Sequence, residues 1–545
     1  MAFNPSAKSS EFHYLAEIFL DGTTLYYADE DLSIQTTNLT GVFYEGRLPQ
    51  QGSLVRSLGT FLEAKETIST FDVQLDNRDG AIEDILTTYT VANREVDIWV
   101  GEGVRKENYS KVFPGVIAHP AGVSWNEQGA SFNIIDKRLK SRITLPADRF
   151  LIDDYPNLET KSVNQPIPII YGNFASNQPG PVQVRAYCVD TETQKFKIAG
   201  HRVSSIDKVL KNAIRMNVAQ AAANLSLNDA SFNLTGTNYD ATVDIVEVNC
   251  QGIVTTNGTL IEKPMDVVRN LQTAYMGLSS VDLSGTAYND GNIETGTEVI
   301  RSTISEESST ELLIGEVLKE SSFDMRFVDG QYNPKSRNLD IQANRASFRE
   351  EDIIIGNSSE EFAKFGVARD PDRIYLNKIR AQYNYSPIDA RYLSEYTYAL
   401  SSAVADVSAV IERLVNYNWY YKQAEVEGRA QREVATFSTE PAEVEMTVTS
   451  RALLKNLADQ IDLTYNVFTD RPFQIRRMDL DLSNMTVRLN AWDFLSLGSG
   501  RWATGSAVAY ASADATERGS NGYWCNGDGF ATSSDSTSLN VSKWF

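Results

Sequence analysis

The sequence predicts a mainly β protein with α+β parts, in which two β-barrel-like domains are separated by a β-rich insertion and a small α/β unit. Three observations lead to this prediction. Short runs of β-branched and aromatic residues, bounded by Gly, Asn and Asp turn signals, recur toward both ends of the chain. Two helical segments with regular apolar spacing lie between them. The chain has 545 residues, which is too long for one core, so several folded units are expected.

The first barrel-like domain is expected to span residues 1–172. Turn signals such as Asp21-Gly22 and the stretch from Asp76 to Gly80 supply the backbone conformations that tight turns require. Two prolines precede a short apolar strand that ends at Gly172, as is common at a domain edge. Strands that should pair as an antiparallel barrel or sandwich are predicted at residues 16–20, 71–75, 96–100 and 131–135.

Residues 173–262 are expected to form a β-rich inserted domain. Strands are predicted at residues 195–198 and 243–248. The Ala- and Asn-rich stretch 218–227 has no assigned structure. Residues 263–351 then form the small α/β domain.

Two helices are predicted in that α/β domain. The first follows Pro264, a favoured first helical residue, covers residues 265–276 and ends at Gly277. The second covers residues 309–321, and Ser309 is its expected N-cap. Its apolar face is predicted to contain Leu312, Leu313, Val317 and Leu318.

Residues 352–495 are expected to form the second barrel-like domain, with one helix. The helix is predicted to open at Thr449-Ser450 and to place Leu453, Leu454, Leu457, Ile461 and Leu463 on one face. Strands are predicted at residues 353–355, 374–385, 444–448, 476–482 and 486–490; Ile379, Ala381 and Tyr383 alternate in the second of them. The aromatic group Tyr417, Trp419, Tyr420 and Tyr421 is expected in the core or at a subunit contact, not as a ligand platform.

Residues 496–545 are rich in Gly, Ser and Asp and are expected to be an assembly segment. Such a composition cannot bury a core of its own, so its large side chains should contact another surface. The candidate assembly residues are Trp502, Tyr523, Trp524, Phe530, Trp544 and Phe545.

Charge and composition restrict the function. The chain carries 50 basic and 72 acidic residues, a net charge of −22, which argues against a protein that grips nucleic acid by neutralising phosphates. No apolar run approaches the roughly 20 residues of a membrane span, and no signal peptide is evident at the start, so synthesis in a cytoplasm is expected. The three widely spaced cysteines are expected to be reduced thiols.

No catalytic chemistry is predicted, and neither are catalytic, cofactor-binding or metal-binding residues. His13, His119 and His201 are isolated, and the sequence has no nucleophile elbow or phosphate loop. A carboxylate glycosidase would need two acids across one cleft, which adjacent residues such as Asp153-Asp154, Glu306-Glu307 and Glu360-Glu361 seldom achieve. The Asp76 to Gly80 stretch lacks the spacing of an EF-hand calcium loop, so a plain turn is the better interpretation.

The order of these elements resembles the tail hub proteins of long-tailed bacteriophages. The passages that carry the likeness are residues 68–77, 112–117, 132–136, 167–172 and 263–268, and the endings 522–530 and 542–545. The resemblance implies a ring in which each chain contributes two related barrels, so that three chains match a six-fold tube. It also implies a location in the virion tail, after synthesis in the host bacterium.

The partners that the resemblance implies are the chain itself as a homotrimer, a distal tail or tube protein, tip or fibre proteins and the tape measure protein. DNA would pass through at ejection without specific binding. Two alternatives stay open: a six-fold distal tail ring or other baseplate component, and a receptor- or cell-wall sugar-binding tail protein with carboxylate glycosidase activity. A sugar-binding fibre should show repeats or a coiled-coil stalk, and the sequence shows neither.

Overall fold

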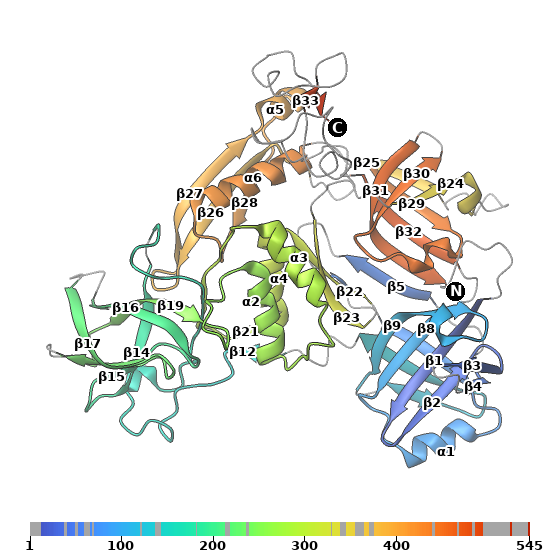
Figure 1. Ribbon diagram of the computed structural model, residues 1–545, viewed down its shortest axis with the longest axis horizontal. Coiled ribbons are helices and arrows are strands. Elements are labelled where there is room, and N and C mark those ends of the chain that lie inside the picture. The colour runs from blue at the N-terminus through green and yellow to red at the C-terminus, as the bar shows by residue number, and fades with distance from the viewer. Residues whose placement is uncertain are drawn as a thin grey trace.

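The computed structural model divides the chain into several β units around a central helical unit (Figure 1). The described residues are 12–36, 41–48, 53–58, 66–67, 70–119, 122–136, 143–180, 182–212, 218–235, 239–328, 330–337, 345–354, 365–369, 375–438, 442–465, 468–481, 486–493, 524–525 and 543–544. Strands dominate, and helices gather in the middle of the chain. The predicted class, mainly β with α+β parts, is confirmed.

The unit predicted as the first barrel, which keeps that name below, is a nine-stranded sheet in the order β10-β11-β9-β8-β1-β2-β4-β3, with β7 pairing to β11. Alternate residues of β1 and β8 face a continuous apolar interior, as expected for strands with one packed face. Its elements are β1 (Phe12–Leu20), β2 (Thr23–Ala28), β3 (Leu32–Gln35), β4 (Gly41–Gly46), β7 (Thr70–Asp76), α1 (Ala81–Thr88), β8 (Glu95–Glu102), the 3-10 turn η1 (Lys106–Asn108), β9 (Tyr109–Ile117), β10 (Val123–Trp125) and β11 (Gly129–Asp136).

The second barrel-like sheet has the order β24-β30-β31-β32-β29-β25. Strand β5 (Ser53–Leu58) also pairs with β31, although it comes from the first barrel's part of the chain. Its elements are β24 (Ala346–Arg349), η5 (Glu350–Asp352), β25 (Phe365–Arg369), β29 (Ala442–Val448), η7 (Ser450–Leu454), β30 (Gln460–Tyr465), β31 (Phe468–Asp481) and β32 (Thr486–Trp492), and the short β6 (Glu66–Thr67) pairs with β5. One apolar cluster runs through both barrels.

The insertion between the barrels is a closed six-stranded barrel, β14-β15-β18-β17-β16-β19. Phe196 and Phe232 stack in its interior with ring centroids 5.6 Å apart. The stretch left unassigned in the sequence is its strand β17 (Val218–Ser226). The other strands are β14 (Val184–Asp190), β15 (Lys195–Lys197), β16 (Val203–Lys211), β18 (Ser231–Thr235) and β19 (Val246–Ile253), the last beginning three residues later than predicted.

The helical unit lies at the centre of the molecule (Figure 1). Both predicted helices are confirmed as α2 (Pro264–Asn270), continued by a π turn η4 (Leu271–Tyr275), and α4 (Thr310–Ser321). The Ser309 side chain caps α4 by accepting a hydrogen bond from the Leu312 N–H. Completing the unit are α3 (Gly285–Thr295), β12 (Thr144–Leu145), β13 (Ile169–Tyr171), β20 (Ser302–Ile304), β21 (Ser308–Ser309), β22 (Phe323–Val328) and β23 (Gln331–Ser336), whereas the 3-10 turn η3 (Thr160–Ser162) contacts β14 of the insertion.

Residues 375–438 form a separate three-stranded sheet, in the order β27-β26-β28, with helix α6 packed on one face (Figure 1). Ile379, Ala381 and Tyr383 all face inward on β26, as their alternation predicted. The strands predicted within residues 352–495 are therefore divided between two sheets. The elements are β26 (Lys378–Ser386), β27 (Arg391–Ala399), α5 (Ser401–Val407), β28 (Glu412–Asn416) and α6 (Gln423–Phe437).

Three predictions about local structure are wrong. The helix expected from Thr449-Ser450 is only the 3-10 turn η7, which ends because Lys455 is already extended, with φ −90° and ψ 153°, on the way to strand β30. Leu312 is 57% exposed, since it lies about 100° around helix α4 from Leu313. Of the strand expected at residues 353–355, residues 353 and 354 contain a single bridge at Ile353, and residue 355 lies outside the described residues.

Candidate functional site

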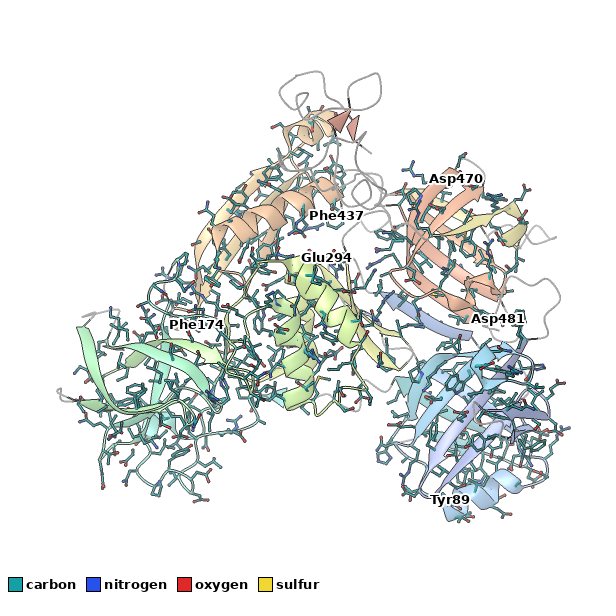
Figure 2. The ribbon with its side chains drawn as sticks, viewed as in Figure 1. Tyr89, Phe174, Glu294, Phe437, Asp470 and Asp481 are labelled. Atoms are coloured by element: carbon teal, nitrogen blue, oxygen red, sulfur yellow. The ribbon has the colours of Figure 1, made fainter. Side chains whose placement is uncertain are left out.

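The structure brings buried charged side chains together where the helical unit meets helix α6. A cavity of about 100 Å³ lies at this junction. Figure 2 labels two of its lining residues, Glu294 of α3 and Phe437 of α6. We call Glu298, Glu320, Glu425, Glu433 and Arg429 the junction cluster.

Glu320 ties helix α4 to the buried aromatic segment. Its carboxylate oxygens accept hydrogen bonds from the backbone N–H groups of Asn418, at 2.7 Å, and of Trp419, at 2.9 Å. The side chain is 6% exposed, and burial raises the pKa of its carboxyl to about 8. Glu320 therefore holds two backbone groups in place from the buried end of helix α4.

Glu298 and Arg429 form the charged centre of the cluster. Arg429 donates to Glu298 and, at 3.2 Å, to the Ser322 hydroxyl. The Tyr420 hydroxyl and the Arg432 guanidinium also donate to Glu298, at 2.9 and 3.1 Å. The Arg429 guanidinium lies 4.6 Å from the centre of the Tyr420 ring, in cation–π contact.

Two further carboxyls of α6 complete the cluster. Glu425 accepts a hydrogen bond from the Val299 N–H at 3.2 Å, and burial raises its pKa to about 7. Glu433 accepts one from the Tyr417 hydroxyl at 3.3 Å, and burial raises its pKa as well. Helix α6 is thus fastened to its surroundings by side chains on its buried face.

The junction cluster is suited to holding parts of the chain together and poorly suited to catalysis. Both oxygens of Glu320 are occupied by backbone donors, and Glu298, Glu425 and Glu433 each accept at least one hydrogen bond. At about 100 Å³ the cavity is smaller than small-ligand sites, which usually measure roughly 300–1,000 Å³. Within the described ranges, no group of three His, Cys, Asp or Glu side chains is arranged to hold a metal ion.

A second buried ionic contact joins the helical unit to the second barrel. Asp324 of β22 lies 2.9 Å from Arg337 and 3.2 Å from Arg476 of β31, and all three are at least nine-tenths buried. Burial alone would raise the pKa of Asp324, but the attraction of the two guanidinium groups outweighs it and the pKa is lowered. Asp324 is consequently ionised in the folded protein.

Arg301 joins three units. It donates to the backbone oxygens of Asn173 and Gly180, at 3.1 and 2.8 Å, and to the side-chain oxygen of Asn384 at 2.7 Å. Its guanidinium stacks 4.0 Å from the centre of the Tyr421 ring. Burial lowers the pKa of Arg301 to about 10, so it stays charged at neutral pH.

None of these joining residues was singled out from the sequence. Of these residues, Arg429 would have been the easiest to identify from the sequence, because it shares a helical face with Val426, Ala430 and Val434. The aromatic group was interpreted correctly, since all four of its rings are at most 3% exposed.

Most of the predicted assembly residues lie outside the described residues: Trp502, Tyr523, Phe530 and Phe545. Strands β33 (Trp524–Cys525) and β34 (Lys543–Trp544) are described, and Trp524 is paired with Trp544 along their backbones. The assembly role of these residues stays a prediction.

The acidic pairs and histidines do not come together. Glu307 pairs with Arg149, Asp153 and Asp154 are exposed, and Glu360-Glu361 lies outside the described residues. In the Asp76 to Gly80 turn, Asp76 forms an ion pair with Arg78, and Asp79 forms one with Arg47. His13 lies 3.3 Å from Asp29, His119 is exposed, and His201 accepts a hydrogen bond from the Ile170 N–H at 2.9 Å.

No family model matches the sequence, and no curated protein matches it significantly. Solved structures do resemble the chain. A 43 kDa tail protein of prophage MuSo2 from Shewanella oneidensis is 10% identical with a TM-score of 0.40, and the match spans 90% of this chain and 100% of that one. These structural neighbours are tail and virion proteins.

Two further neighbours are similar to the chain in the same way. The tail protein from Neisseria meningitidis MC58 is 7% identical, with a TM-score of 0.40 over 89% of this chain and 99% of that one. A chain from the virion of a native gene transfer agent particle is 10% identical, with a TM-score of 0.42 over 62% and 86%. At these identities the likeness concerns the fold alone.

Among the described helices, none has the length and apolar composition of a membrane span.

Proposed function

We propose that this chain is a structural, non-enzymatic subunit at the lower end of a bacteriophage tail, where it acts as a hub that continues or closes the tail tube. The observation that carries the proposal is strand β5, which leaves the first barrel and pairs with β31 of the second from Ser53↔Asp481 to Ser57↔Arg477. The barrels also share one apolar cluster. A shared strand and a shared apolar cluster favour a fixed arrangement of the two sheets.

A fixed pair of barrels suits a ring in which each chain supplies two similar contact positions for the subunits of the tail tube. Three chains would then present six positions to a six-fold tube, and the closed trimer would satisfy the surfaces that each chain leaves open. The assembly segment, residues 496–545, would add contacts to the neighbouring copy or to tail partners.

The proposed partners are a distal tail or tube protein above, tip or fibre proteins below, and the tape measure protein within. DNA would pass through the centre at ejection. The net charge of −22 supports this part of the proposal, since an acidic wall repels a polyanion and lets it slide.

A structural role also agrees with the chemistry of the interior. The buried carboxyls of the junction cluster are engaged by backbone N–H groups, tyrosine hydroxyls and arginines, so they hold chain segments together. Neither Cys188 nor Cys250 is an activated thiol, because burial raises the pKa of Cys188 to about 12 and that of Cys250 further.

The proposal is tested by locating the chain in virions. A short peptide tag placed in the exposed loop at Val410 should bind gold-labelled antibody at the distal end of the tail. Virions without the tag provide the control. Gold along the tail shaft or on the head, or tails that lack the chain altogether, would contradict the proposal.

A further inference from the structure

A loop of the insertion is fastened to strand β13 of the helical unit. We call residues 199–202, between strands β15 and β16, the His201 loop. The Gly200 N–H donates a hydrogen bond to the Pro168 carbonyl at 3.2 Å, and the Ile170 N–H donates one to the Nε2 atom of the His201 ring at 2.9 Å. Strand β13 also pairs with β20. The loop therefore joins the insertion to a strand that belongs to the centre of the molecule.

The two partners of the His201 ring fix its protonation state. The Arg202 carbonyl lies 2.9 Å from Nδ1 and can only accept a hydrogen bond, so Nδ1 carries a proton. The Ile170 N–H can only donate, so Nε2 carries a lone pair and no proton. An imidazole ring with one proton is neutral. His201 is therefore neutral wherever both hydrogen bonds are made.

A second proton on the His201 ring is incompatible with this contact. An imidazolium ring has two donors and no acceptor, so the N–H groups of Nε2 and of Ile170 would face each other over 2.9 Å. The Ile170 N–H would lose its acceptor in a place that is only partly open to water. The ring must therefore leave Ile170 before it can hold the second proton.

The surroundings of the ring also oppose a positive charge. Burial lowers the pKa of His201, the hydrogen bond to the Arg202 carbonyl raises it in part, and the charge of Lys197 on β15 lowers it. Lys197 is held in place by Asp229, at 2.5 Å. The neutral ring is therefore the form that the folded protein favours.

Other charged groups lie near this part of the insertion but do not bond to the ring. Asp148, Arg149 and Asp154 line a shallow surface hollow beside Lys197 and Gly200. The two hydrogen bonds of the His201 ring go to backbone groups instead. Within the described part of the chain, no carboxylate forms an ion pair with this ring, so none compensates a charge on it.

His13 has the opposite surroundings and provides a comparison within the same chain. Its Nδ1 atom lies 3.3 Å from the Asp29 carboxylate, and its Nε2 atom lies 3.7 Å from that of Glu30. Two carboxylates attract an imidazolium ring, so a second proton leaves the contacts of His13 intact. Only the His201 contact combines a titrating ring with a partner that the second proton repels.

We propose that His201 is a pH-sensitive switch, which fastens the His201 loop to strand β13 at neutral pH and releases the loop in mildly acidic solution. Release uncovers the Ile170 N–H and the Pro168 carbonyl. The rest of the insertion stays attached, because the backbone bonds from Gly252 to Gly172, at 2.9 Å, and from Phe174 to Cys250, at 2.8 Å, involve no titrating group. The inference goes beyond the proposed tail function and does not depend on it.

The test is hydrogen–deuterium exchange of the full chain at about pH 7.5 and pH 5, corrected for the intrinsic effect of pH on amide exchange. Mass spectrometry reads the peptides that contain Ile170 and His201. We expect their protection to fall by about three- to thirtyfold at pH 5, because a released imidazole titrates near pH 6.5 and is then almost fully protonated. Peptides from strand β18 of the same barrel should keep their protection.

Four variants identify the group that titrates. His201→Gln keeps a donor and an acceptor on a planar group that does not titrate, and its protection should be the same at both pH values. His201→Phe lacks both, so it should exchange faster than the wild type at both pH values, again without a pH response. His13→Gln and Asp324→Asn are the controls and should respond to pH as the wild type does, which separates this switch from the other ionic contacts.

Two results would overturn the proposal. One is that the wild type protects the peptides of Ile170 and His201 equally well at pH 7.5 and at pH 5. The other is that His201→Gln and His201→Phe both lose protection at pH 5 to the same extent as the wild type, because a group other than His201 would then control the loop.

Discussion

Asp324 of strand β22 and Arg476 of strand β31 form an ion pair of 3.2 Å in the interior, between the helical unit and the second barrel. Arg337 pairs with the same carboxylate at 2.9 Å. The two guanidinium groups are accommodated in the interior because Asp324 supplies the negative charge between them. This contact binds together segments about 150 residues apart in the sequence.

We predict that Asp324→Asn destabilises the protein by about 3–5 kcal/mol, because it leaves two buried guanidinium groups without their carboxylate. Denaturant unfolding followed by circular dichroism measures the change. The control is Glu445→Gln, which breaks the exposed 2.7 Å pair with Arg488 on the same sheet and should cost less than about 1 kcal/mol. Equal effects for the two variants would show that the buried pair has no special role.

The same contact has a pH dependence of known sign. The pKa of Asp324 is lower in the folded protein than in the unfolded chain. The contribution of the ionised carboxylate to the free energy of unfolding is therefore fully present above the pKa of the unfolded chain, and it is lost as the pH falls through the pKa of the folded protein. Acid unfolding of the wild type should therefore include a step that Asp324→Asn lacks.

Glu320 predicts the opposite pH dependence. The pKa of Glu320 is about 8 in the folded protein, against an ordinary value of 4.5. The contribution of the protonated carboxyl to the free energy of unfolding is therefore complete below about pH 4.5 and is lost as the pH rises to about 8. The unfolding temperature of the wild type should fall between pH 5 and pH 9, and Glu320→Gln should flatten this fall. An identical slope in wild type and Glu320→Gln would refute the assignment.

Arg301 predicts a loss of stability that lysine does not restore. Arg301→Lys keeps the charge but cannot reach Asn173, Gly180 and Asn384 with one planar group. We expect both Arg301→Lys and Arg301→Ala to lower the free energy of unfolding, by roughly 2–4 kcal/mol as buried hydrogen-bonding partners lose their donor. Thermal unfolding gives the measurement, and full rescue by lysine would mean that charge alone matters.

Much of the fold was predictable because its signals are local. The Ser309 cap and the spacing of Leu313, Val317 and Leu318 identified helix α4, and the alternation at Ile379 and Ala381 identified strand β26. Local spacing also led to one wrong prediction, a helix after Thr449. Leu453, Leu457 and Ile461 suggested a helix, but apolar residues three or four apart also occur where a 3-10 turn leads into a buried strand.

The joining residues were not predictable for a different reason. Glu320 and Asp324 read as ordinary charged residues at the end of a helix and in a strand, because their partners Trp419 and Arg476 lie about 100 and 150 residues further along the chain. The pairing of β5 with β31 is likewise long-range. A single sequence carries no direct signal of such contacts.

Removal of residues 496–545 tests the proposed assembly segment. If the segment contacts partners, the truncated chain should keep its unfolding temperature as a monomer and lose self-association. Differential scanning calorimetry and light scattering measure the two properties. A much lower unfolding temperature of the isolated truncated monomer would show that the segment belongs to the chain's own core.

The most direct test of the central claim is the mass of the assembly that the full chain forms with its tail partners, measured by native mass spectrometry. The account predicts three copies in a closed ring. It also predicts that Val55→Pro, which places a proline in the middle of strand β5 where it pairs with β31, abolishes the ring while Val55→Ala keeps it. A chain that stays monomeric with its partners present, or a ring of six copies, would contradict the account.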